Sequence, residues 1–265
     1  MKWHALLDSC CQRLLGVQSA HSLILLVALF VPGLVAAGEV QVAVAANFTA
    51  PAKVIAAGFE QETGHKALLS FGATGKFYAQ IANGAPFEVL LAADADTPAR
   101  LEREGRGVAG SRFTYAIGKL VLWSARPGLV DARGEVLKKG DFAHIALAEP
   151  KLAPYGAAAM AVLSNLGVLP AVSAKIVRGE NIAQTCQFVV SGNAELGFVA
   201  LSQVMKEGVI GEGSAWVVPA DLYPTIRQDA IILDKGKVNP AARAWIDYLK
   251  GDKARGVMRA SGYAF

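Results

Sequence analysis

Two junctions in the chain carry the residue types best suited to binding an anion. They are Ala45–Thr49 (AANFT) and Phe71–Gly75 (FGATG), and each follows an apolar strand-like run and precedes a helix-like run. The first N–H groups of a helix have no intrahelical acceptor and lie at the positive end of the helix dipole, so an oxyanion can bind there. The amide of Asn47 and the hydroxyls of Thr49 and Thr74 add neutral donors. These junctions predict a cradle that recognises an anion mainly through dipoles.

The second junction also invites comparison with a phosphate-binding nucleotide loop. Ser70 stands where such a loop needs its first glycine, and Phe77 stands where it needs Ser or Thr. We therefore reject a nucleotide site. Lys76 is the one charged residue close to the two junctions, and we predict a solvated helix residue that attracts anions at long range.

Several polar residues have simpler structural interpretations. Asn and Thr are favoured helix caps, so Asn47 and Thr49 taken alone could serve only as caps. Asp94-Ala95-Asp96 precedes Thr97-Pro98, a pattern that favours a helix cap over a metal site. The pattern around Cys186 predicts a small buried hydrophobic residue rather than a reactive thiol.

Strands and helices are expected to alternate along the chain. Near-continuous apolar strands of this kind favour a parallel sheet covered on both faces. The expected strands are 40–45, 67–71, 88–93, 117–123, 144–148, 176–177, 196–201, 216–218 and 230–233. The expected helices are 51–62, 78–83, 97–104, 154–166, 182–190, 239–249 and 252–260.

Four strand-to-helix junctions result, at 46–49, 72–75, 153–156 and 180–182. Ligands of open parallel sheets bind outside the carboxyl ends of the strands. Two junctions belong to the first part of the chain and two to the middle, as expected if two lobes face each other across a cleft.

The first 37 residues have the features of an export signal. Lys2 and Arg13 precede the apolar run 23–31, and small residues before Ala37 suit cleavage near that position. Cleavage would remove Cys10 and Cys11, so the mature chain could form no internal disulfide. The remaining 228 residues (265 minus 37) are enough for two small lobes. With 24 basic and 21 acidic side chains their charge is too balanced for a nucleic-acid binder.

At these motifs the chain resembles the periplasmic molybdate/tungstate-binding proteins of ABC transporters. The resemblance covers nearly all of residues 39–265. Seven phrases carry it, in order: 45–48 (AANF), 71–75 (FGATG), 83–89 (NGAPFEV), 92–94 (AAD), 153–156 (APYG), 196–201 (LGFVAL) and 248–251 (YLKG).

The resemblance implies an α/β fold of the type II periplasmic binding protein class, with two discontinuous lobes and the ligand cleft between them. Lobe I would comprise residues 39–118 plus 228–265, and lobe II residues 119–227. The implied function is a periplasmic receptor that captures molybdate or tungstate and delivers it to the membrane permease of an ABC importer. The family pattern implies a monomer with no enzymatic activity, no catalytic residue and no cofactor, which binds no metal as a cation.

The family's ligand contacts carry over by position. Asn47 matches a position that donates through both its side chain and its backbone, and Thr74 matches a hydroxyl donor. Tyr155 and Ile182 match backbone N–H donors at helix starts. Ala46 matches a position where relatives have a hydroxyl residue, and it can offer only its backbone. Many family members have a ligand-contacting Tyr where this chain has Ala200.

Hydrogen-bond chemistry narrows the choice of ligand. Molybdate is acceptor-only near neutral pH, whereas hydrogen phosphate also needs an acceptor for its proton. None of the matched positions is Asp or Glu, which argues against phosphate. Sulfate and thiosulfate remain alternatives, because separation from sulfate depends on cavity radius. An exported enzyme is a poorer alternative, since the mature chain offers only His65 and His144 and no nucleophile-base motif.

Overall fold

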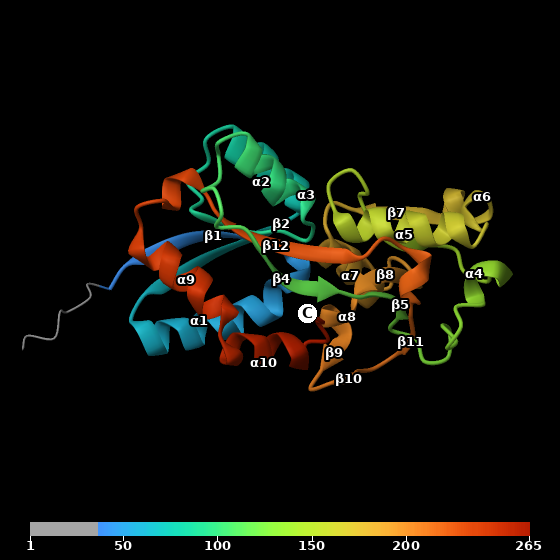
Figure 1. Ribbon diagram of the computed structural model, residues 1–265. Helices are drawn as coiled ribbons and strands as arrows, with labels where there is room; N and C mark the ends of the chain where they lie inside the picture. Colours follow the sequence, from blue (N-terminus) through green and yellow to red (C-terminus); the bar gives the residue numbers. More distant parts are fainter. Residues whose placement is uncertain (1–36) are drawn as a thin grey trace, which may run out of the picture. The chain divides into compact units, whose positions relative to one another are not determined.

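The computed structural model describes residues 37–265, which form one compact unit. The predicted export signal, with Cys10 and Cys11, falls on residues outside the described part. The unit contains two five-stranded sheets, each covered by helices on both faces (Figure 1). These are the two lobes expected from the sequence.

The first sheet has the strand order β2-β1-β3-β12-β4. Its strands are β1 (Glu39–Ala45), β2 (Lys66–Gly72), β3 (Val89–Leu91), β4 (Phe113–Gly118) and β12 (Ile226–Ile232). Successive side chains of β1 point to opposite faces of the sheet, and apolar ones are found on both faces. Val40, Val42 and Val44 pack on one face, whereas Ala43 packs on the other.

Helices α1, α9 and α10 cover the valine face, and α2 and α3 cover the other (Figure 1). Their bounds are α1 (Thr49–Thr63), α2 (Thr74–Ala82), α3 (Asp96–Arg103), α9 (Pro240–Lys250) and α10 (Asp252–Ala260). Gly64 ends α1 with a left-handed φ of 72°, as its place after the helical pattern predicted. The short 3-10 turn η1 (Ala46–Phe48) separates β1 from α1.

The second sheet has the order β11-β5-β8-β6-β7. Its strands are β5 (Leu120–Ser124), β6 (Ile145–Ala148), β7 (Ile176–Gly179), β8 (Leu196–Ala200) and β11 (Ser214–Val217). The surrounding helices are α4 (Val136–Lys139), α5 (Pro154–Asn165), α6 (Leu169–Val172), α7 (Ile182–Val190) and α8 (Leu201–Val204). The remaining elements are η2 (Ser173–Lys175), η3 (Ala220–Leu222), η4 (Asp234–Gly236), and the two-stranded pair β9 (Met205–Lys206) and β10 (Val209–Ile210).

The prediction of wholly parallel sheets is wrong. β1 runs parallel to β2 and β3, and β6 runs parallel to β7 and β8. In contrast, β12 is antiparallel to β3 and β4, and β5 is antiparallel to β8 and β11. A strand buried on both faces has the same continuous apolar run whichever way it points, so the sequence pattern could not distinguish parallel from antiparallel pairing.

Two short connections join the sheets. β4 ends at Gly118 and β5 begins at Leu120, so the chain leaves the first sheet across Lys119 alone. It returns through residues 218–225, between β11 and β12. Of the helices in the described part, no single one is both long and apolar enough to span a bilayer, although Pro154–Asn165 and Leu169–Lys175 meet that criterion jointly with a bend of 119°.

Candidate functional site

All five residues that the sequence singled out for ligand binding line one small cavity between the two sheets. The cavity is partly open to solvent, and about 210 Å³ of space, which includes that open solvent, lies between its lining atoms. It lies where β1, β2 and β3 end and where α5 and α7 begin. Its lining residues are Ala45, Ala46, Asn47, Gly72, Ala73, Thr74, Ala93, Ala153, Pro154, Tyr155, Asn181 and Ile182.

Backbone N–H groups are the main hydrogen-bond donors of this cavity. Thr74 is the first residue of α2, Ile182 is the first of α7, Tyr155 is the second of α5, and Asn47 lies in η1. Within residues 37–265 none of these four N–H groups has a hydrogen-bond acceptor. Unpaired N–H groups at helix starts are the groups that an oxyanion can accept from.

The start of α7 shows how one donor is kept free. Asn181 Oδ1 accepts from the N–H groups of Ala183 and Gln184 at 2.9 and 3.0 Å, so this cap uses the second and third donors of the helix. The N–H of Ile182 remains. Gln203 fixes this turn from the other side, because its Nε2 donates to Ile182 O at 3.0 Å.

Gln203 also explains the surroundings of Ala200. Gln203 Oε1 accepts from the N–H of Ala200 at 2.9 Å, which ties the end of β8 to the start of α7. Ala200 is fully buried and is not one of the residues that line the cavity. The role of Gln203 could not be predicted from the sequence, since nothing in its local pattern marks a contact 21 residues away.

Thr74 brings a side-chain hydroxyl to the cavity lining. Its side chain is buried, and Oγ1 accepts from the N–H of Ala93 at 3.0 Å. Because the hydroxyl accepts there, its own hydrogen is available to a ligand. This arrangement agrees with the donor role predicted for Thr74.

Asn47 is bonded differently from the prediction. Its Nδ2 donates to Gln228 Oε1 at 2.8 Å and to Tyr263 Oη at 2.9 Å, so both amide hydrogens are used within the protein. The side chain caps neither η1 nor α1. Thr49 Oγ1 donates to Ala46 O at 2.8 Å and is likewise unavailable. The donor that Asn47 presents to the cavity is therefore its backbone N–H.

A buried polar network lies behind the cavity and joins the two sheets. Gln228 Nε2 donates to Tyr155 Oη at 3.0 Å, and Ser202 Oγ donates to Asn47 O at 2.8 Å. Tyr263 Oη lies 3.0 Å from Asn47 O and 2.9 Å from Ser202 Oγ. Burial raises the pKa of the Tyr155 and Tyr263 hydroxyls, so both stay neutral at physiological pH.

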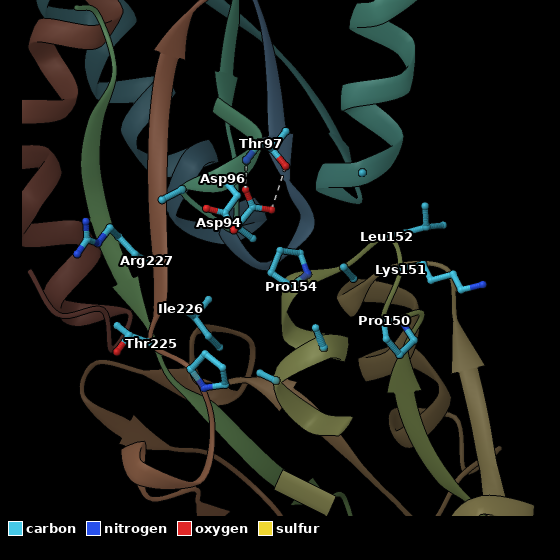
Figure 2. Close-up of a pocket in the computed structure, with 17 residues that line it drawn as sticks. Asp94, Asp96, Thr97, Pro150, Lys151, Leu152, Pro154, Thr225, Ile226 and Arg227 are labelled. Atoms are coloured by element: carbon cyan, nitrogen blue, oxygen red, sulfur yellow. Dashed lines mark hydrogen bonds between the residues drawn. The ribbon is translucent and has the colours of Figure 1, made fainter. Parts of the chain in front are cut away.

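A larger crevice adjoins this cavity and shares Ala93, Ala153 and Pro154 with it (Figure 2). It is open to solvent, and about 430 Å³ of it is accessible to water-sized molecules. Asp94 and Asp96 line it, and Figure 2 shows the charged end of Lys151 pointing away from its centre. Arg227 lines it as well, and Figure 2 shows its guanidinium also directed away from the centre. The two carboxylates and the outward direction of both cations make this crevice a poor oxyanion site.

Asp94 bonds to the first turn of α3, close to the capping role that the sequence predicted, although the N-cap residue itself is Ala95. Its Oδ1 accepts from the N–H of Thr97 at 2.7 Å, and Oδ2 accepts from the Thr97 hydroxyl at 3.2 Å (Figure 2). Burial nevertheless raises the pKa of this carboxyl. Across the described ranges, no group of three or more His, Cys, Asp or Glu side chains is arranged to hold a metal ion.

The remaining titratable residues lie away from the cavity lining. His65 is buried and its Nδ1 accepts from the N–H of Gly38 at 2.9 Å, while His144 is exposed. Cys186 is partly buried in α7, and burial raises the pKa of its thiol to about 11. The partial burial of Cys186 is consistent with the small hydrophobic role predicted for it from the sequence.

Comparison with known proteins gives consistent matches over most of the chain. Residues 40–264 match the family described as bacterial extracellular solute-binding proteins. A molybdate-binding protein ModA of Azotobacter vinelandii is 66% identical over 86% of this chain and 90% of its own length. A molybdate-binding protein ModA of Rhodobacter capsulatus is 52% identical over 92% of this chain and 94% of its own length.

Solved structures give the same result. The periplasmic molybdate-binding protein of Azotobacter vinelandii superposes with a TM-score of 0.83 at 43% identity, and the match covers 86% of this chain and 99% of that one.

Proposed function

Because the chain belongs to the bacterial extracellular solute-binding proteins and has the two-lobed type II periplasmic binding protein fold, we propose that it is a receptor for molybdate. In this proposal the protein captures molybdate, and also tungstate, in the small interlobe cavity. It then delivers the anion to the membrane permease of an ABC importer. The names of the relatives at 66% and 52% identity support molybdate as the ligand.

One observation carries the proposal: the cavity presents donors and no charge. Four backbone N–H groups and the Thr74 hydroxyl are free to donate, and none of the described lining residues is charged. Molybdate and tungstate carry no proton near neutral pH, so each of their oxygens can only accept. Hydrogen phosphate would bring a proton for which this lining supplies no carboxylate.

The number of donors is adequate for useful affinity. A buried dianion is costly unless its lost water is replaced by preorganised donors. Hydrogen bonds to charged groups contribute about 1.5–3 kcal/mol each. Five such bonds are of the same order as the binding free energy of about −8 kcal/mol that a micromolar dissociation constant requires.

The proposal assigns roles residue by residue. Asn47, Tyr155 and Ile182 donate through backbone N–H groups, Thr74 donates through its backbone and hydroxyl, and Ala46 offers only backbone. Gln203 and Asn181 keep the α7 donor in place. Ala200, which stands where many relatives have Tyr, contributes packing rather than a ligand contact.

The remaining expectations belong to the same proposal. Lobe I comprises residues 39–118 plus 228–265, and lobe II comprises residues 119–227. The protein is exported to the periplasm after cleavage near Ala37 and works there as a monomer. It binds and releases its ligand without catalysis, uses no cofactor, and binds no nucleic acid.

Calorimetric titration of the processed protein with molybdate, tungstate, sulfate, thiosulfate and phosphate tests the function. Molybdate and tungstate are expected to bind at micromolar concentration or below, with sulfate much weaker and phosphate weaker still. Sulfate has the charge and shape of molybdate but is smaller, so a donor cage sized for molybdate makes poorer contacts with it. Tighter binding of sulfate or thiosulfate than of molybdate would favour the alternative receptor, and turnover of any substrate would overturn the receptor assignment.

A further inference from the structure

The start of α2 contacts the second lobe at a place outside the anion cavity. Lys76 Nζ lies 2.7 Å from Glu180 Oε2, and the N–H of Gly75 donates to Leu152 O at 2.9 Å. None of these four residues is among those that line the cavity.

Both contacts join elements that belong to different sheets. Gly75 and Lys76 lie in α2, which covers the first sheet. Leu152 follows β6, and Glu180 follows β7, both of the second sheet. If the lobes separate, both contacts must break.

Gly75 permits an approach that a larger residue would hinder. A Cβ placed on this residue would lie 3.1 Å from Leu152 Cα and 3.2 Å from Leu152 O, which is tighter than most carbon contacts in proteins. The neighbours that would have to move are backbone atoms. A side chain at position 75 therefore holds the two lobes slightly apart.

We propose that Gly75, Lys76, Leu152 and Glu180 form an interlobe clasp that prolongs the life of the closed, anion-loaded state. The clasp rests on the proposed function, because its effect is exerted on anion release. Its residues act by positioning the lobes and do not touch the ligand. Breaking the clasp leaves every donor of the cavity in place but lets the lobes open more often.

The expected effect of the ion pair is modest. The Lys76 and Glu180 side chains are 44% and 49% exposed, and ion pairs at that exposure are weak and screened by salt. We expect its loss to speed anion release about two- to fivefold at low ionic strength and less at high salt.

Replacing Glu180 by Gln separates the clasp from simple electrostatic steering. Steering predicts that removing a negative charge near an anion site speeds association and tightens binding. The clasp predicts faster release instead. Release is measured by loading the processed protein with radiolabelled molybdate and chasing with excess unlabelled molybdate.

A charge swap provides the matched rescue. Lys76→Glu and Glu180→Lys should each speed release, and the double variant should return the rate toward that of the wild type. The double variant keeps the net charge and the pair but reverses its direction. Glu135→Gln is the control. It makes the same change in charge as Glu180→Gln, but the Lys138–Glu135 pair that it breaks (3.2 Å) lies within one lobe.

Gly75→Ala tests the backbone contact independently of charge. We expect release about tenfold faster or more, with cavity residues unchanged. A thermal unfolding midpoint close to that of the wild type would confirm that the variant is folded. Should that midpoint fall sharply, the Glu180→Gln rate and the charge swap still decide the proposal.

The two proposals fail in different ways. If the wild-type protein binds no oxyanion by calorimetry, the receptor function is wrong. If it binds molybdate, but Glu180→Gln and both single charge reversals release it no faster than Glu135→Gln does, the clasp is wrong and the receptor function stands.

Discussion

The carboxamide of Gln228 donates from Nε2 to the hydroxyl of Tyr155 at 3.0 Å, and this bond connects β12 of one sheet with α5 of the other. Both side chains are almost completely buried. The same carboxamide accepts at Oε1 from Asn47 Nδ2. One side chain therefore fixes residues on both sides of the cavity, and their backbone N–H groups are positioned by contacts behind the site.

Gly118 makes this arrangement possible, and substituting it is our first prediction. A Cβ on Gly118 would overlap Tyr155 Oη and would lie 2.5 Å from Gln228 Nε2. We expect Gly118→Ala to break the Gln228–Tyr155 bond and to lower the free energy of unfolding by about 1–3 kcal/mol, because buried polar groups lose their partners. Urea denaturation measures the stability, and calorimetry should show weaker molybdate binding as well.

Gly256→Ala is the matched control for this substitution. Gly256 lies inside α10 and has no heavy atom within 4 Å of an added Cβ. Because Ala is a better helix former than Gly, this change should raise the free energy of unfolding by about 0.5–1 kcal/mol. Equal effects of the two substitutions would contradict the role given to Gly118.

The Thr74 hydroxyl gives the second prediction. Thr74→Ala removes a donor to the anion and the acceptor of the Ala93 N–H, so binding should weaken by about 1–3 kcal/mol. Thr74→Ser keeps the hydroxyl and should retain most of the affinity. Calorimetric titration with molybdate measures both variants, and indistinguishable affinities would exclude the hydroxyl from the site.

The four predicted junctions came together because the signal that marks them is local, and the family resemblance selected the individual residues within them. A strand followed by small residues and a helix start marks an edge of the sheet, and parallel strands bring such edges to one side. The Ile182–Val190 helix was predicted with its correct ends. Five scattered sequence positions therefore line one cavity.

The supporting side chains were missed because their contacts span long separations. Gln228 lies 181 residues from Asn47, and Tyr263 lies 216 residues from it. In the sequence, Gln228 lies between the charged residues Arg227 and Asp229, ahead of the predicted strand 230–233, and Tyr263 is an aromatic residue near the end of the chain. Only the folded chain shows that these two occupy the Asn47 amide, which leaves the backbone N–H as the remaining part of its predicted donor role.

The Cys186 thiol gives the third prediction. Burial raises its pKa to about 11, so almost all of it is protonated at neutral pH. We expect alkylation by iodoacetamide to be much slower than that of an unfolded peptide cysteine near pH 8. Mass spectrometry of a protein with Cys10→Ser and Cys11→Ser measures the alkylation of Cys186 alone. Alkylation at the peptide rate would contradict the structural role assigned to Cys186.

The buried carboxyl of Asp94 gives the fourth prediction, a pH dependence of stability. Burial raises its pKa above the ordinary value of about 3.9, so the folded protein holds this proton more tightly than the unfolded chain does. Asp94 therefore lowers the free energy of unfolding as pH rises from the unfolded pKa through the folded pKa. Asp94→Asn keeps an oxygen acceptor for the Thr97 N–H and removes the charge. Its stability relative to the wild type should rise across that window and level off near neutral pH.

Asp131→Asn should show the opposite slope. The N–H of Arg133 donates to Asp131 Oδ1 at 2.8 Å, and such backbone hydrogen bonds lower the pKa of this carboxyl. The Asp131 carboxylate stabilises the fold above its unfolded pKa, and that contribution is lost as pH falls through the lower folded pKa. Its replacement should therefore lose stability relative to the wild type as pH rises. Urea denaturation of all three proteins between about pH 3 and pH 7 compares the slopes. If the stability of both variants relative to the wild type changed in the same direction with pH, burial would not be what sets the pKa of the Asp94 carboxyl.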